Sequence, residues 1–321
     1  MLHEGENIVS ATKTLLAPPR QIPLGVLCGA GAGALWGLVF LAPELVGTFT
    51  PMQLAVGRYL AYGVIACVLI APRWPVLSRT VTRQDWQALF WLSLLGNILY
   101  YILLSMAVQL GGIALTSLIA GFLPVIVTVV GSREADAVSL KQLVPSLILC
   151  GAGMLCIGSQ AILVATPAGS SITGLFCAFA ALASWSAYVV WNSRCLGRLH
   201  HISGHEWNLL TGVVTGAQAV LLVPVAWVLT NIHHTAQGWE RFISVSVGIA
   251  FLASICGNAL WNRMSRLLPL TMVGQMILFE TLFALLYGFL WEQRTPRPLE
   301  VMAFLLVVSS VLSCIAAHRK A

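Results

Sequence analysis

GNILY at residues 96–100 returns in the second half of the chain as GNALW at residues 257–261. Each copy lies in the third apolar segment of its half. The first apolar segments match as well, with ALW at residues 34–36 against ASW at residues 183–185. Similarity that recurs in a fixed order is the signature of an internal repeat. The sequence therefore predicts two halves with the same fold.

The composition indicates a membrane protein. Of the 321 residues, 58% are hydrophobic and 9% are charged, whereas soluble domains are about 25% charged. A membrane helix needs roughly 20 apolar residues, and the apolar segments lack the alternation of barrel strands. We therefore predict an all-α membrane protein with ten transmembrane helices. They span residues 24–43, 51–71, 86–109, 112–131, 142–163, 172–192, 207–230, 241–262, 267–291 and 299–317.

The helices divide into two sets of five. Residues 1–23 form an N-terminal tail, residues 24–163 the first five-helix repeat and residues 172–317 the second. Because five is odd, the second repeat must enter the membrane from the side opposite to the first. Two inverted repeats suit a carrier that opens alternately to the two faces of a bilayer.

The positive residues predict the orientation. Thirteen of the 17 Lys and Arg residues fall in loops and tails on one side, three fall on the other, and Arg58 lies within a predicted helix. Cytoplasmic loops carry the excess of Lys and Arg. We therefore expect a multi-pass protein of the cell membrane with both termini in the cytoplasm. The net charge of +6 comes from these loops, so we expect no nucleic-acid partner.

Several short motifs accompany the repeat. The first half has Trp36, Pro51, Arg58-Tyr59, Leu123-Pro124-Val125 and Glu134, and the second has Trp185, Phe279-Glu280-Thr281 and Glu292. With these motifs the chain resembles the EamA-domain members of the drug/metabolite transporter superfamily over nearly its whole length. It departs from them at Thr281, where the family often has proline, and Arg58 has no clear counterpart in the second half.

The resemblance implies a ten-helix carrier of two inverted repeats. Its central cavity would be lined mainly by helices one, three, four, six, eight and nine. Such proteins commonly move small metabolites and often export amino acids.

Glu280 is the strongest candidate for a functional residue, because it lies near the middle of the ninth predicted helix. A charge there costs roughly 2.5–3.5 kcal/mol, so Glu280 should face protein or water rather than lipid. Desolvation favours the neutral form of a carboxyl, so Glu280 could bind a proton and release it when a substrate amine arrives. The alternative is a structural carboxyl that holds helices together. We favour the functional role, because intramembrane carboxylates commonly mark transport pathways.

Arg58 is the second charge within a predicted helix. It lies about 10 Å below the outer end of the second helix, and Glu280 lies about 16 Å below the outer surface, at ~1.5 Å per residue. These depths permit a salt bridge between them. A long arginine near a helix end also snorkels to the interface, and we favour this structural role for Arg58.

Aromatic and amide side chains fall at matched places in the two halves. They could line a cavity for an amphipathic metabolite, with rings supplying apolar surface and amides fixing polar groups. The alternative is that Trp and Tyr near helix ends are interface anchors, which suits Trp261 better than Trp36 or Trp185. Besides Glu280, the candidate substrate-binding residues are Trp36, Asn97, Tyr100, Tyr101, Trp185, Tyr188, Asn258, Trp261, Asn262 and Gln275.

Glycine recurs every four residues in the first helix, at Gly25, Gly29, Gly33 and Gly37. This spacing predicts one smooth face along which another helix packs closely.

The sequence has no nucleotide-binding loop, nucleophile elbow or metal-ligand spacing. We therefore expect no enzyme activity, no cofactor and no metal, and transport energy must come from gradients. The leading hypothesis is a secondary transporter that exports small metabolites such as amino acids by alternating access. Proton coupling and a homo-oligomer are left open. The alternatives are an exporter of drugs or quaternary cations, and a membrane scaffold or receptor without transport.

Overall fold

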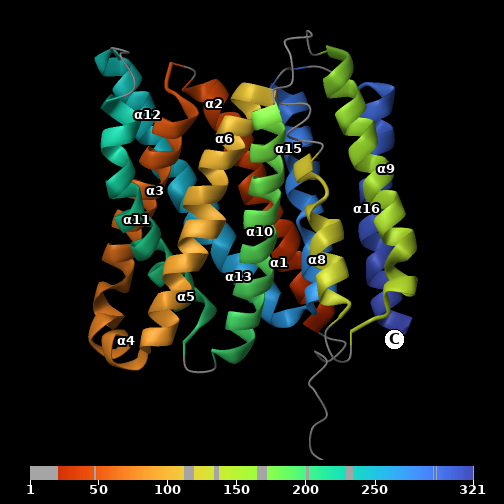
Figure 1. Cartoon of the computed structure of the whole chain (residues 1–321), viewed down its shortest axis with the longest axis horizontal. Helices are drawn as coiled ribbons and strands as arrows, with labels where there is room; N and C mark the ends of the chain where they lie inside the picture. Colours follow the sequence, from red (N-terminus) through yellow and green to blue (C-terminus); the bar gives the residue numbers. More distant parts are fainter. Residues whose placement is uncertain are drawn as a thin grey trace, which may run out of the picture.

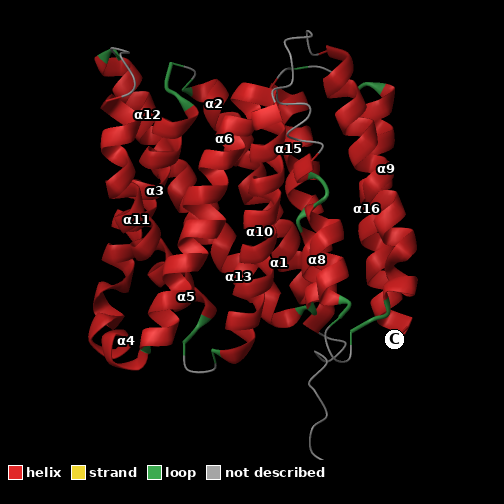
Figure 2. Cartoon of the chain, viewed as in Figure 1, coloured by secondary structure: helices red, strands yellow, loops and turns green. Residues whose placement is uncertain are grey.

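The computed structural model is a bundle of helices that run roughly side by side (Figure 1). It describes residues 21–46, 48–111, 119–133, 137–164, 172–199, 202–228, 234–291, 293 and 295–320. Helices dominate, and the described residues include no strand (Figure 2).

The helices of the first half are α1 (Gln21–Gly37), η1 (Leu38–Leu41), α2 (Ala42–Leu45), α3 (Pro51–Ile70), η2 (Ala71–Arg73), α4 (Trp74–Thr80), α5 (Arg83–Ser93), η3 (Leu94–Leu99), α6 (Tyr100–Gly111), α8 (Leu123–Gly131) and α9 (Leu140–Val164). Those of the second half are α10 (Ile172–Arg198), α11 (Gly204–Val228), α12 (Ala236–Ile249), η4 (Ala250–Gly257), α13 (Asn258–Leu267), α14 (Leu270–Met276), α15 (Leu278–Trp291) and α16 (Pro298–Lys320).

Seven stretches of helix among the described residues are long and apolar enough to cross a membrane. Two shorter apolar helices, Ile22–Gly37 and Leu140–Cys156, accompany them. Each predicted span overlaps a helix. For the predicted span 112–131 that helix is α8, and residues 112–118 lie outside the described residues, as do residues 1–20 of the predicted tail. The described residues thus form a helical bundle with several stretches that could cross a membrane.

Two spans expected to be plain α-helices contain a π-helical stretch. η3 joins α5 to α6, and η4 joins α12 to α13. The repeated motif overlaps η3 in the first half and the end of η4 in the second. A π-helical stretch breaks the regular hydrogen-bond ladder and often marks a functional site. Side chains from the other half bond its carbonyls: Ser184 Oγ donates to Leu95 O at 2.8 Å, and Trp36 Nε1 donates to Ala253 O at 3.1 Å.

The ninth predicted span is also divided. α14 ends at Met276 and α15 begins at Leu278, so Glu280 lies in the first turn of α15. In the first half α8 begins at Leu123, directly after a turn at residues 121–122. The break therefore occurs at corresponding places, with leucine in one half where the other has a carboxylate.

Helices of one half pack mainly on helices of the other. α3 packs on α11, α8 on α14, α9 on α16, α6 on α10, and α1 on α13 and α15. α3 and α11 approach closely at a pair of glycines, where a Cβ on Gly216 would lie 2.6 Å from the Cα of Gly63. Real Cβ atoms do not come so close, so glycine lets the two backbones touch.

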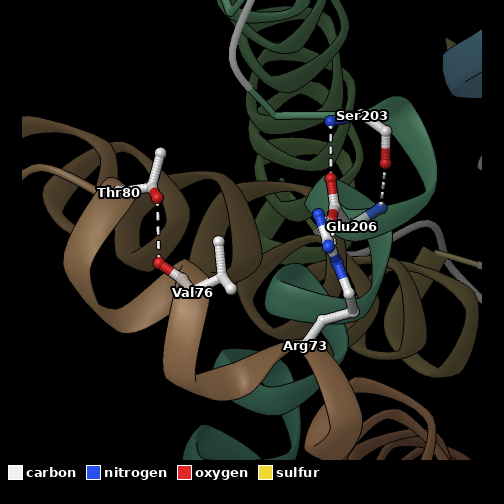
Figure 3. Close-up of polar contacts among 5 residues, drawn as sticks. All are labelled: Arg73, Val76, Thr80, Ser203 and Glu206. Atoms are coloured by element: carbon white, nitrogen blue, oxygen red, sulfur yellow. Dashed lines mark hydrogen bonds and ion pairs between the residues drawn. The ribbon is translucent and has the colours of Figure 1, made fainter.

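One end of the bundle is fastened by polar contacts around Glu206 (Figure 3). Ser203 Oγ accepts from the Glu206 N–H at 3.1 Å, and Glu206 Oε2 accepts from the Ser203 N–H at 2.9 Å. This capping box begins α11. Arg73 Nε donates to Glu206 Oε1 at 3.0 Å, which ties η2 to α11. Nearby, Thr80 Oγ1 donates to Val76 O at 2.8 Å within α4.

We expect the cap to matter more than the ion pair. Ser203→Ala should lower the free energy of unfolding by about 1 kcal/mol, because an N–H at the start of α11 loses its acceptor. Arg73→Gln should cost less than about 0.5 kcal/mol, because the Arg73 side chain is 61% exposed. Thermal unfolding of the full chain in detergent ranks the two variants. A larger loss for Arg73→Gln would contradict this assignment.

Candidate functional site

Four aromatic side chains meet where α1, α6, α10 and α13 come together. The ring centroids of Trp36 and Trp261 are 5.0 Å apart, and those of Trp36 and Trp185 are 6.2 Å apart. Tyr100 stacks on Trp185 with centroids 5.4 Å apart and an angle of 21°. We call these four rings the aromatic cluster. They come from both halves of the chain, as the repeat-matched positions predicted.

Hydrogen bonds attach the aromatic cluster to the second π-helical stretch. Trp36 Nε1 donates to Ala253 O in η4 and also to Asn258 Oδ1 at 3.2 Å. Gly257 allows this approach, since a Cβ there would lie 2.8 Å from Trp36 Nε1. Trp36 is 8% exposed, so it acts inside the bundle and not as an interface anchor. One more indole N–H in the cluster, that of Trp261, is buried without a partner among the described residues.

The two intramembrane charges approach the aromatic cluster from α3 and α15. Arg58 Nε donates to Ser254 Oγ at 3.1 Å, and its guanidinium carbon lies 5.3 Å from the Tyr59 ring centroid. Arg58 and Tyr100 are both near enough to Glu280 to interact with its carboxylate electrostatically. Among the described residues, no ion pair within 4.0 Å joins Arg58 to Glu280. The two charges therefore share one region without neutralising each other by direct contact.

Four side chains of this region are only partly buried. Arg58, Tyr100, Trp185 and Glu280 keep some accessible surface, although Tyr100 and Glu280 lie deep in the bundle. A cavity of about 10 Å³ is lined by Tyr59, Tyr101 and seven apolar residues, and neither of the two charges nor the aromatic cluster lines it. The Tyr101 ring is 6.1 Å from that of Tyr59, edge to face. The arrangement can present a cation, a carboxylate and aromatic surface to a small polar guest.

Two further candidates, Asn97 of η3 and Tyr188 of α10, are used in helix packing. Asn97 Nδ2 donates to Thr215 Oγ1 at 3.1 Å, which joins η3 to α11. The Tyr188 ring packs on Gly96, where a Cβ would lie 2.4 Å from the ring. The structure therefore does not bring Asn97 or Tyr188 into the aromatic cluster.

Asn262 and Gln275 also lie in separate polar contacts. Asn262 Oδ1 accepts from Asn192 Nδ2 at 3.1 Å, and its Nδ2 donates to Gly204 O at 3.3 Å. Gln275 Oε1 accepts from Ser310 Oγ at 3.1 Å. Both amides are buried, at 3% and 0% exposure. Their hydrogen bonds satisfy polar groups between helices, which leaves little capacity for a substrate.

Sequence reasoning missed two residues of this region. Ser254, which accepts a hydrogen bond from Arg58, lies in η4, four residues before Asn258. Tyr59 entered the sequence motif only as the neighbour of Arg58. In the structure, the guanidinium carbon of Arg58 lies over the Tyr59 ring. Arg58 itself was expected to snorkel, and instead it is bonded to Ser254 across the bundle.

The bond from Trp36 to η4 gives a testable prediction. Trp36→Phe keeps an aromatic ring but leaves Asn258 Oδ1 without this donor, so we expect a loss of about 1–3 kcal/mol in the free energy of unfolding. Trp185→Phe is the matched control, because no indole bond of Trp185 is seen among the described contacts. Thermal unfolding in detergent compares the two, and equal losses would contradict a role for the hydrogen bond.

These features define a class, a multi-pass helical membrane protein with charged and aromatic side chains gathered in its interior. The EamA-like transporter family model matches residues 172–315. Inner membrane protein YtfF of Escherichia coli (strain K12) is 32% identical over 306 residues, which cover 91% of this chain and 95% of that protein. The chain therefore belongs to the EamA-like transporter family, which confirms the resemblance found in the sequence.

A solved crystal structure of a protein shares the fold. It matches with a TM-score of 0.69 and 16% sequence identity, over 91% of this chain and 98% of that one. At this identity the likeness concerns the fold alone.

Proposed function

We propose that this chain is a secondary transporter of the cell membrane that exports small metabolites such as amino acids by alternating access. The observation that carries the proposal is the placement of Glu280 and Arg58, two charges of opposite sign that form no ion pair within 4.0 Å among the described residues and lie beside partly exposed aromatic rings. An amino acid carries an ammonium and a carboxylate. Glu280 suits the first, Arg58 suits the second, and the aromatic cluster suits an apolar side chain.

Two inverted five-helix repeats, residues 24–163 and 172–317, would supply the movement. The packing supports this arrangement, because α3–α11 and α9–α16 each pair corresponding helices of the two halves, and α8–α14 joins parts of the corresponding fourth and ninth predicted spans. The same two-fold relation matches α1 with α10 and α13 with α6, so it converts the α1–α13 pair into the α10–α6 pair. The π-helical stretches η3 and η4 and the breaks before α8 and α15 occur in both halves as well. Ten spans and a two-fold relation account for all of these features together.

The orientation follows from charge. With thirteen of 17 Lys and Arg residues on one side, both termini and the capping box of α11 are assigned to the cytoplasm. Helix α3 then begins at the outer face, and Arg58 and Glu280 are reached from that side through about 10 Å and 16 Å of helix. We propose that Glu280 also carries the coupled proton, since it is the acidic group placed beside the substrate.

Arg58 separates this proposal from a drug or quaternary-cation exporter. A site for a quaternary cation needs the aromatic rings and one carboxylate, and a guanidinium beside them would repel that ligand. A zwitterion uses both charges. This favours amino acids over quaternary cations as the substrate class.

Transport by the purified chain in proteoliposomes tests the proposal. The panel contains labelled amino acids and quaternary ammonium compounds, each assayed with and without a pH gradient. Uptake of an amino acid above protein-free vesicles, with competition from other zwitterions, is the expected result. Uptake of quaternary ammonium compounds alone would favour the drug exporter, and no uptake of either class would favour a scaffold or receptor.

A further inference from the structure

A groove of about 530 Å³ lies between α5 and α10, away from the aromatic cluster. α10 packs closely on α6 and only sparsely on α5, and this divergence leaves the groove. Both helices end beside it, because α5 begins at Arg83 and α10 ends at Arg198. The groove therefore opens at the level where the membrane helices meet the aqueous phase, and one wall comes from each half of the chain.

The chemical character of the residues that line the groove changes with depth. On α5, Gln84, Gln87 and Trp91 are exposed, and spacings of three and four residues place them on one face. On α10, Arg198 and Trp191 face the groove with the same overall spacing. Seven residues of helix correspond to about 10 Å. The groove thus has a guanidinium and amides at its mouth and two indoles about 10 Å deeper.

The mouth carries one carboxylate, Asp85, and one guanidinium, Arg198. Asp85 Oδ2 accepts from the Thr82 N–H at 2.9 Å and from Thr82 Oγ1 at 2.7 Å, so this carboxylate is used in starting α5. Arg198 is exposed and donates a long bond to Cys195 Sγ at 3.7 Å, which leaves most of its donors for a ligand. A guanidinium with free donors suits a phosphate group, which it can bind through two parallel hydrogen bonds.

We propose that this groove binds one phospholipid of the cytoplasmic leaflet, with the phosphate on Arg198 and the glycerol and upper acyl chains along Trp191 and Trp91. The polarity of the groove matches that of the lipid from phosphate to acyl chain, and indoles favour the depth of the headgroup boundary. The volume lies within the range of ordinary ligand sites. Because its walls belong to different halves, the bound lipid contacts both.

Native mass spectrometry of the full chain in detergent tests the site. The added ligands are phosphatidylglycerol and a diacylglycerol with the same acyl chains and no phosphate. The wild type should retain phosphatidylglycerol and not diacylglycerol. Arg198→Gln should weaken retention about tenfold, the scale of a charge-assisted hydrogen bond, and Arg198→Lys should restore part of it.

Arg263→Gln is the matched control, because Arg263 is an exposed arginine of α13 assigned to the same side but does not line the groove. It should retain phosphatidylglycerol as the wild type does. Equal weakening in both variants would reduce the effect to general surface charge and overturn the proposal. Equal retention of diacylglycerol would also overturn it, as would displacement of the lipid by millimolar inorganic phosphate, which would indicate a site for free phosphate.

Discussion

Glu280→Gln will remove the part of substrate accumulation that depends on a pH gradient. The variant keeps the size and hydrogen-bonding capacity of the side chain but cannot exchange a proton. A pH gradient of about 1.7 units, equivalent to about 100 mV, supplies about 2.3 kcal/mol per proton, which corresponds to roughly 50-fold accumulation. Wild-type proteoliposomes should approach such a ratio with a transported amino acid. Glu280→Gln should fall to the level reached without a gradient, because nothing then links proton and substrate.

Glu240→Gln is the matched control for that experiment. Glu240 is an exposed carboxylate in α12, outside the region of Arg58 and the aromatic cluster, so its neutralisation should leave the accumulation ratio unchanged. Glu280→Asp tests whether a carboxylate suffices when it is one methylene shorter. If Glu280→Gln keeps the wild-type response to the gradient, Glu280 is not the proton site and the coupling assigned to it is wrong.

The two charges of the candidate site could be selected from the sequence, because burial of a charge in lipid is costly wherever it occurs. Glu280 and Arg58 stood out for that reason alone. Trp36, Trp185, Tyr100 and their amide neighbours followed from the repeat, since residues at matched positions of two halves tend to meet at the interface between them. The structure gathers those three aromatics beside the two charges.

The partners of the remaining polar residues could not be predicted. A buried amide in a membrane helix must find a hydrogen-bond partner, yet its sequence position does not say which helix supplies it. Gln275 is hydrogen-bonded to Ser310, and Asn262 is hydrogen-bonded to Asn192, so neither amide lies in the aromatic cluster. The π-helical stretch η4 could not be predicted either. Two of its carbonyls accept hydrogen bonds from other helices: Ala253 O from Trp36 Nε1 of α1, and Ile255 O from Asn208 Nδ2 at 2.8 Å. These contacts are tertiary, and no local pattern encodes them.

The glycine stripe of α1 shows how packing and site are connected. The sequence predicted a face for close packing, and the structure places Gly33 against the start of α15. A Cβ on Gly33 would lie 2.5 Å from the Cβ of Phe279 and 2.7 Å from the backbone nitrogen of Glu280. The contact at Gly33 therefore fixes the position of the residue to which we assign the proton.

Gly33→Ala should consequently damage both stability and transport. The added methyl group meets backbone atoms of α15, which cannot rotate away as a side chain would, and such overpacking costs about 1–3 kcal/mol. Gly288→Ala is the matched control on α15, because no atom lies within 4 Å of the Cβ it would add. Alanine is the better helix former by about 1 kcal/mol, so Gly288→Ala should be neutral or stabilising. The same Gly→Ala change is thus expected to lower the stability at residue 33 and to leave it unchanged or raise it at residue 288.

Thermal unfolding in detergent, followed by transport in proteoliposomes, separates the two effects of Gly33→Ala. A lower unfolding midpoint with normal gradient-driven accumulation would mean that α1 packs on α15 without setting the position of Glu280. A wild-type midpoint would mean that α15 yields at this contact, and the close approach would then not constrain the site. Loss of accumulation at a temperature where the variant is still folded is the result we expect, because α15 must shift to admit the methyl group and Glu280, in its first turn, must shift with it.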